Sequence, residues 1–242
     1  MVKYAISAKS IVKDYGCVRA LDNVAIDVEF GEIFGFLGPN GAGKTTMINI
    51  LTGQLKATSG HAEVLGIDCA KEPVRVRANV GIVPEQENPP SFLTAIEYLH
   101  FVSKIRKIKG YEAKCAKWLE LLDFCDQKNV LCKDLSRGTR QKVMIAQAFL
   151  HEPKVVFIDE PLINLDPLVQ KKIKVFLCEY AGKGNCIFLS THVLEIAGEI
   201  CRRVAIIDKG KIIACDEVRA LQKKKDETLE NVFIRLVCGS DA

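Results

Sequence analysis

The chain has 242 residues, of which 48% are hydrophobic and 26% are charged, and its formal net charge is +4. A chain of this length can bury a substantial core as one large domain, or as a domain with a subdomain. The nearly balanced charge argues against a basic footprint over the whole domain, so we expect no nucleic acid among its partners. No run approaches the roughly 20 apolar residues of a membrane-spanning helix, so we expect none in this sequence.

The sequence contains ten cysteines but no pair with the C-x-x-C spacing of many zinc and redox sites. Its opening residues lack the apolar segment of a signal peptide. Cysteines such as Cys178 and Cys186 lie in apolar runs, which predicts that they behave as small core residues. We therefore expect a cytoplasmic protein with reduced cysteines.

The first third of the chain alternates short β-rich runs with turns. After a glycine-rich segment, residues 45–53 read as a helix with Gly53 as its C-terminal cap. Strands are predicted at residues 6–16, 24–30, 32–37, 61–68 and 80–86.

From about Ser91 to Asp134 the apolar spacing becomes helical, and Gly110 separates two helices. Strands and helices then alternate, which predicts an α/β fold with a mostly parallel central sheet and a helical insertion. Later helices are predicted near residues 140–150, 168–178 and 193–199, and strands at 155–159, 186–190, 204–208 and 211–215.

We assign residues 1–220 to one domain, with a helical subdomain at about 91–134. A last helical segment, roughly residues 217–236, is expected beyond the core, so residues 221–242 are assigned to a C-terminal helical extension.

The strongest functional pattern is "GPNGAGKTT", which fits G-x-x-x-x-G-K-[ST] and lies between a predicted strand and a predicted helix. Glycines let successive backbone N–H groups curl around phosphates, and the helix N-terminus adds positive potential. Lys44 should reach the β- and γ-phosphates, and the Thr45 hydroxyl should hold Mg²⁺. The predicted nucleotide-binding residues here are Gly38, Pro39, Asn40, Gly41, Ala42, Gly43, Lys44, Thr45 and Thr46.

The run "VVFIDE" is an apolar strand that ends in two acids, and buried carboxylates are costly unless compensated. Asp159 fits the acid on the Mg²⁺ side of a phosphate loop, and Glu160 can act as general base toward water. A structural turn acid is the alternative for each. His192 follows a strand end, where open α/β sheets place ligand groups, and it either contacts the γ-phosphate region or is structural.

A second anion-type pattern is "LSRGTRQKV", in which Ser136 and Gly138 open a helix. The chain therefore carries two stretches suited to phosphate.

In order and spacing, these motifs resemble those of the ATP-binding subunit of an ABC transporter, nearly end to end. "VGIVPEQ" resembles the Q-loop, "LSRGT" the ABC signature, "VVFIDEP" Walker B, "INLD" the D-loop and "STH" the switch histidine. The resemblance implies a P-loop NTPase fold of the ABC type, with an antiparallel β subdomain. It also implies that Tyr15 stacks on adenine, that Glu85 joins Thr45 and Asp159 at Mg²⁺, and that Ser136, Gly138 and Asp166 belong to the ATP site.

The same resemblance implies an ATP hydrolase whose two copies pack head to tail on ATP, with the signature of one copy facing the nucleotide of the other. Closure would drive a membrane permease, which would hold the chain at the inner face of the cell membrane. The segment "TLENVFIRL" resembles the ending of ABC-2-type, drug-efflux ATPases, which implies export.

Several positions depart from the family pattern. Glu85 stands where the Q-loop glutamine is expected, with Gln86 one place later. Arg137 replaces the first glycine of the signature and Thr139 its glutamine. In the D-loop region, the unusual residues are Leu162, Ile163 and Asn164.

The alternative is an ABC-type ATPase without a transport role. Translation and repair types are disfavoured, since the sequence has one such domain and no sustained heptads. An iron–sulfur assembly type remains compatible in size. A P-loop kinase or GTPase would leave "LSRGT" and "STH" without a role.

Overall fold

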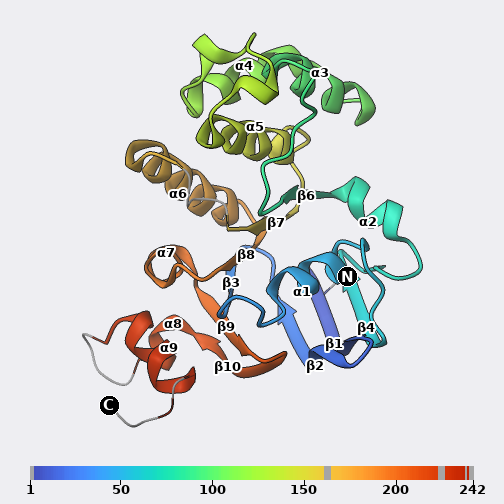
Figure 1. The fold of residues 1–242 in the computed structure, drawn as a ribbon, viewed down its shortest axis with the longest axis vertical. Coiled ribbons are helices and arrows are strands. Elements are labelled where there is room, and N and C mark those ends of the chain that lie inside the picture. The colour runs from blue at the N-terminus through green and yellow to red at the C-terminus, as the bar shows by residue number, and fades with distance from the viewer. Residues whose placement is uncertain (1–2, 161–164, 223–226, 238, 240–242) are drawn as a thin grey trace.

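The computed structural model describes residues 3–160, 165–222, 227–237 and 239. The central sheet has six strands in the order β10-β9-β3-β8-β7-β6 (Figure 1). All neighbouring strands in it are parallel except β10, which pairs antiparallel with β9. This confirms the predicted mostly parallel sheet. Its strands are β3 (Ile33–Leu37), β6 (Val80–Val83), β7 (Val155–Asp159), β8 (Cys186–Thr191), β9 (Arg203–Asp208) and β10 (Lys211–Glu217).

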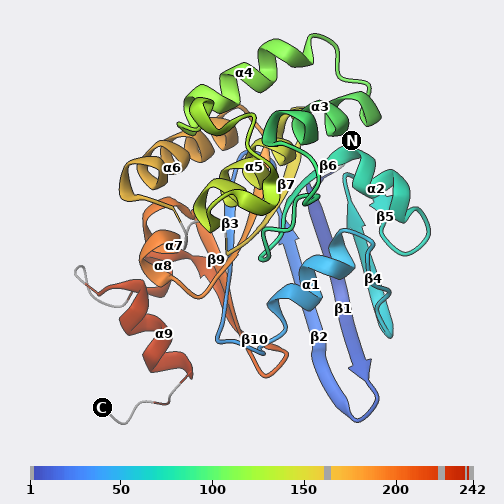
Figure 2. The same ribbon diagram turned by 45° about the horizontal axis from the view of Figure 1, so that its top comes forward.

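A second sheet has the order β2-β1-β4-β5 and is antiparallel throughout. It is the antiparallel β subdomain that the resemblance implies. Figure 2 shows it beside α1 (Lys44–Leu51), the helix that follows the glycine-rich loop. Its strands are β1 (Ile6–Tyr15), β2 (Val18–Val28), β4 (Ser59–Val64) and β5 (Ile67–Asp68).

The central strands are buried on both faces, and alternate residues enter two separate hydrophobic clusters. Phe34 and Phe36 of β3 join α1 and the antiparallel sheet in one cluster. Ile33 and Leu37 of the same strand pack on the opposite face, against the helices. Because side chains alternate along a strand, this pattern fixes which face each residue occupies.

The remaining helices lie mostly on that opposite face and above it (Figure 1). The first of the helical insertion starts at a capping box, since the Thr94 hydroxyl accepts from the Glu97 N–H and the Glu97 carboxylate accepts from the Thr94 N–H. These helices are α2 (Pro73–Asn79), α3 (Ala95–Ile105), α4 (Tyr111–Leu121), α5 (Arg137–Phe149), α6 (Pro167–Gly182), α7 (Leu194–Ile200), α8 (Val218–Leu221) and α9 (Leu229–Val237).

The structure corrects four details of the sequence-based description. Helix α5 begins at Arg137, which confirms the assignment of Ser136 and Gly138 to a helix start and corrects the range near residues 140–150, because the Ser136 hydroxyl caps the helix by accepting from the Thr139 N–H. Helix α2 was not anticipated. Cys178 is exposed, since it lies on the outer face of α6 rather than in the core.

The last correction concerns the segment at residues 217–236. It contains two helices, α8 and α9, rather than one. Leu229 and Val232 of α9 are buried in the main hydrophobic cluster, so this helix is packed on the core. Most apolar residues of α9 pack against this cluster, as expected for a helix that covers a hydrophobic surface, whereas Ile234 is exposed.

The parallel register brings several strand ends to one edge of the sheet. Leu37 lies opposite Thr191, and Asp159 lies opposite Ser190. The residues that follow these strands, including Gly38, Glu160 and His192, therefore come together at that edge.

His151, just after α5, is a partly buried histidine. Its Nε2 lies 3.1 Å from the carbonyl oxygen of Val80. Because a carbonyl oxygen can only accept a hydrogen bond, Nε2 carries the proton. Its Nδ1 is buried and has no hydrogen-bond partner among the described residues. Burial lowers the pKa of His151 from 6.5 to about 4, and Arg106 acts in the same direction.

We expect the free energy of unfolding to fall as the pH drops below 6.5. Below this pH His151 is protonated in the unfolded chain, whereas in the folded chain it stays neutral down to a pH of about 4, so acid favours the unfolded state. Between pH values of about 7.5 and 5, this histidine should account for a loss of about 2 kcal/mol. Urea unfolding of the wild type and His151→Gln at both pH values measures it. The loss should be smaller in the variant, and equal losses would contradict this account.

Candidate functional site

The loop at residues 38–43 joins β3 to α1, and two of its glycines leave no room for a side chain. A Cβ at Gly38 would lie 2.3 Å from the carbonyl oxygen of Ile207. Gly43 has a φ of 109°, and a Cβ there would lie 2.6 Å from the carbonyl oxygen of Ala20. The backbone can take this path only because both residues are glycine.

Lys44, the first residue of α1, reaches back into this loop. Its Nζ donates to the carbonyl oxygens of Gly38 and Pro39, at 2.8 and 3.2 Å. Nζ also lies 3.9 Å from Oε1 of Glu160, and both side chains are almost fully buried. The loop thus holds the buried ammonium group of Lys44, and an anionic ligand bound in the loop could replace the carbonyl oxygens as its partners.

Thr45 and Asp159 meet across the sheet edge. The Thr45 hydroxyl donates to Oδ2 of Asp159 at 3.0 Å. Burial raises the pKa of the Asp159 carboxyl above its ordinary value, and the neighbouring charges of Glu85 and Glu160 also raise it. A group that compensated this charge would stabilise the ionised form.

These oxygens have the chemistry that Mg²⁺ prefers, a hydroxyl and carboxylates. Among the described residues, however, no group of three or more His, Cys, Asp or Glu side chains is placed to hold a metal ion. The hydroxyl of Thr45 and the carboxylate of Asp159 fit a Mg²⁺ ion that takes its other ligands from a bound phosphate and water, as is common for this ion.

Glu160 is held in place by three hydrogen bonds. Oε2 accepts from the Thr191 hydroxyl at 2.8 Å. Oε1 accepts from the His192 N–H at 2.8 Å and lies 2.7 Å from His192 Nδ1. An ionised carboxylate only accepts, so Nδ1 carries the proton in this pair and Nε2 is the ring nitrogen left for a ligand.

The backbone at Glu160 is unusual. Its φ is 49°, in the left-handed region that side chains other than glycine rarely adopt. Its N–H donates to the carbonyl oxygen of Ser190 at 3.0 Å, which ties this conformation to the end of β8. The strained turn directs the carboxylate toward Lys44 and His192.

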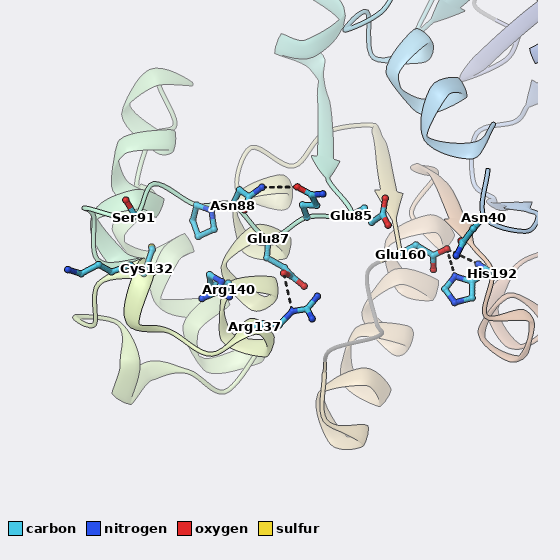
Figure 3. Close-up of a pocket in the computed structure, with 13 residues that line it drawn as sticks. Asn40, Glu85, Glu87, Asn88, Ser91, Cys132, Arg137, Arg140, Glu160 and His192 are labelled. Carbon is cyan, nitrogen blue, oxygen red and sulfur yellow. Dashed lines mark hydrogen bonds and ion pairs between the residues drawn. The ribbon is translucent and has the colours of Figure 1, made fainter. Parts of the chain in front are cut away.

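Two cavities meet at this edge. The smaller, about 250 Å³, is lined by the glycine-rich loop, Lys44, Thr45, Thr46, Glu85, Asp159 and Glu160. The larger, about 830 Å³, extends toward the helical insertion, and Asn40, Glu85 and Glu160 line both. Figure 3 shows the larger one, with Glu160 and His192 on one side and Arg137 and Arg140 on the other.

Comparison with known proteins agrees with this geometry. The family model described as ABC transporter matches residues 21–163, which include the glycine-rich loop, the signature and the strand that ends in Asp159. The chain belongs to the ABC transporter family. The resemblance seen in the sequence is thereby confirmed.

Two relatives and one solved structure illustrate the match. The probable multidrug ABC transporter ATP-binding protein YbhF of Escherichia coli (strain K12) is 32% identical over 96% of this chain and 41% of its own length. The daunorubicin resistance ATP-binding protein DrrA2 of Streptomyces coeruleorubidus is 33% identical over 88% of this chain and 67% of its own. This chain therefore spans less than half of YbhF.

The solved structure is a dimeric post-hydrolysis state of the ATP-binding cassette MJ0796 bound to ADP and Pi. It is 26% identical, covers 88% of this chain and 99% of its own, and has a TM-score of 0.83. The ABC ATPase fold is thus confirmed.

The structure brings together only part of the predicted site. Residues of the glycine-rich loop, Glu85, Asp159, Glu160 and His192 line the two cavities. Tyr15 lines neither; it lies half exposed at the end of β1, with Lys13 Nζ 5.1 Å from its ring centroid. Asp166 also lines neither and caps α6, because its carboxylate accepts from the Val169 N–H.

The structure shows where Glu85 and Gln86, at the departure from the Q-loop pattern, lie relative to the two cavities. Glu85 lines both cavities, whereas Gln86 lines only the larger and accepts from Asn88 Nδ2 at 3.3 Å. Glu85 is therefore the residue nearer the glycine-rich loop. Leu162, Ile163 and Asn164 lie outside the described residues.

In the signature, Thr139 replaces the usual glutamine and is nearly buried. Its hydroxyl donates to Oε1 of Gln127 at 2.8 Å and lies 2.9 Å from the Ser136 hydroxyl. Because the Thr139 hydroxyl has one proton and donates it to Gln127, the Ser136 hydroxyl is the donor in the contact between Ser136 and Thr139. Ser136 and Gly138 line neither cavity of their own chain.

Sequence reasoning missed Thr191, although it lies inside the "STH" motif. An apolar strand that ends in two hydroxyl residues and a histidine was a usable signal, since hydroxyls at the edge of a parallel sheet face the site. It also missed the contact between Arg137 and Glu87, which are far apart in the sequence.

We expect Thr191→Val to slow any hydrolysis that depends on Glu160. The change leaves Oε2 of a nearly buried carboxylate without its hydroxyl donor, so kcat should fall about tenfold. Thr191→Ser keeps the donor and should stay near the wild-type rate. Steady-state phosphate release measures both, and an unchanged kcat in Thr191→Val would contradict a positioning role.

Proposed function

We propose that this chain binds ATP with Mg²⁺ and hydrolyses it, and that it thereby powers a membrane permease. One observation carries the proposal. Lys44, Thr45, Asp159 and Glu160, which come from two distant stretches of sequence, converge at one edge of a parallel sheet. A buried lysine in a glycine loop, beside buried carboxylates, suits a bound triphosphate and its metal ion.

The residues would divide the work of binding. The loop N–H groups and Lys44 would hold the β- and γ-phosphates, with Lys44 exchanging its loop carbonyls for phosphate oxygens. Thr45, Asp159 and Glu85 would hold Mg²⁺, which supplies positive charge beside the phosphates. Tyr15 would stack on the adenine, as the family resemblance implies.

Glu160 would act as the general base. Water attacks the γ-phosphorus, its proton passes to the Glu160 carboxylate, and the bond from the γ-phosphorus to the bridging oxygen breaks to leave ADP and phosphate. Thr191 and His192 would hold the carboxylate in position. The free Nε2 of His192 would face the transferred phosphate, as the family's switch histidine does.

Two copies would enclose the ATP. The dimeric MJ0796 structure supports this, because it has the same fold over most of this chain. Ser136 and Gly138 would contact the nucleotide held by the other copy, and Asp166 would lie in the interface between them.

The permease would dock beside the helical insertion. Large apolar side chains are more than half exposed there: Val74 of α2, Phe92 before α3, and Phe101 and Ile105 of α3. Arg106 joins the two helices, since its guanidinium donates to the carbonyl oxygens of Arg77 and Ala78 at the end of α2. Exposed apolar side chains on and beside these helices suit contact with a helix of a membrane partner.

This partner would place the chain at the inner face of the cell membrane. None of the helices in the described parts of the chain has the length and hydropathy to span a bilayer. Export is favoured by the multidrug and daunorubicin-resistance names of the two relatives and by the resemblance of the "TLENVFIRL" segment.

Replacing Lys44 by Ala should weaken ATP binding at least about tenfold, because a buried cation would no longer meet the phosphates. Titration with a fluorescent ATP analogue measures the affinity. Lys109→Ala, which removes an exposed lysine elsewhere, is the matched control and should bind as the wild type does. Equal affinity of all three proteins would overturn the role of the loop.

Replacing Glu160 by Gln should leave ATP binding intact while reducing kcat by about 10² to 10⁴, since a neutral amide cannot accept the proton. The trapped ATP should then hold two copies together. Light scattering with saturating ATP measures the mass, and Lys44→Ala in the same background is the control that should remain monomeric. A protein that stays monomeric with ATP would contradict the proposed dimer.

A further inference from the structure

Arg137 stands at the position where the family usually has glycine, and its side chain has a defined contact. Its Nε lies 3.8 Å from Oε2 of Glu87, in the loop that follows β6. This is an ion pair at a distance too long for a hydrogen bond. The Glu87 side chain is 7% exposed, whereas that of Arg137 is 72% exposed.

The pair borders the larger cavity, which also contains Glu160, His192 and Asn40 (Figure 3). Arg140, the other arginine on this wall, is engaged, since its guanidinium donates to the carbonyl oxygen of Leu135 at 2.7 Å. Among the contacts of the described residues, Arg137 is therefore the guanidinium on this wall that is held only by a long ion pair, and its own side chain is mostly exposed although Glu87 is nearly buried. At this distance, and with the cation in solvent, the pair holds the arginine weakly, so the guanidinium can exchange partners.

We propose that Arg137 is a further ATP-binding residue, which exchanges Glu87 for the phosphates of the nucleotide held by the second copy. The inference rests on the proposed function, because it needs the head-to-tail pair. A triphosphate offers several charged oxygens to a planar guanidinium, whereas Glu87 offers one carboxylate at a long distance. The usual glycine would contribute only its backbone N–H here.

The exchange makes Glu87 a competitor of ATP for Arg137. Removing the arginine should weaken ATP-driven pairing, and removing the glutamate charge should strengthen it. A salt bridge that served only to stabilise the chain would give the same direction of effect in both variants. The sign of the two effects therefore separates the two roles.

The test uses the Glu160→Gln protein as parent and measures by light scattering the ATP concentration that gives half-maximal dimer. Arg137→Ala should raise this concentration about tenfold, and Glu87→Gln should lower it about threefold, as expected when one charged contact is lost or released. Arg137→Lys keeps the charge and should recover part of the loss. Arg202→Ala removes the arginine of another exposed ion pair, with Glu217, and should match the parent.

Binding of a fluorescent ATP analogue to dilute monomer should be equal in parent and variants, since each chain binds its own nucleotide through the glycine-rich loop. Opposite shifts in the two variants support the exchange, whereas shifts in the same direction, or none, overturn it. If the parent itself stays monomeric at saturating ATP, the proposed function fails, and the inference falls with it.

Discussion

The parallel register of three strands is the constraint on which the site depends. β3, β7 and β8 are held so that Leu37 faces Thr191 and Asp159 faces Ser190. Each strand is buried on both faces, so a slip by one residue would turn its whole apolar set over. The register that satisfies the two hydrophobic clusters is therefore the one that brings the glycine-rich loop beside the acids.

That edge concentrates charge in a buried setting. Lys44 is nearly buried beside Glu160, while Asp159 is nearly buried with its pKa raised by burial. Each is compensated by local donors or acceptors: loop carbonyls for Lys44, the Thr45 hydroxyl for Asp159, and Thr191 with His192 for Glu160. The charged side chains of this site are therefore already ordered before a ligand binds. A ligand needs only to replace the protein groups that these side chains contact.

Much of this could be predicted from sequence because it follows from local rules. The glycine-rich loop, the acids at a strand end and the alternation of strands and helices all follow from patterns within a few residues, and parallel strands bring their ends together. The start of α5 at Ser136 also follows from a local rule, since a serine hydroxyl that accepts from the N–H three residues later caps a helix. The apolar side of α9 predicts that this helix covers a surface, but which surface it covers, like the contact between Arg137 and Glu87, depends on segments that are distant in the sequence.

The two phosphate-type stretches of the chain differ in how they are engaged. Lys44 contacts the glycine-rich loop and lines the smaller cavity of its own chain. Ser136, in contrast, donates to Thr139 and lines neither cavity of its chain. A ligand reaching Ser136 must displace Thr139 as its acceptor, and Gln127 keeps Thr139 in place while it does so. Ser136 is thus hydrogen-bonded within the substituted signature, yet it is exposed and lies outside both cavities. That arrangement suits a surface completed by another molecule better than one that serves the chain's own nucleotide.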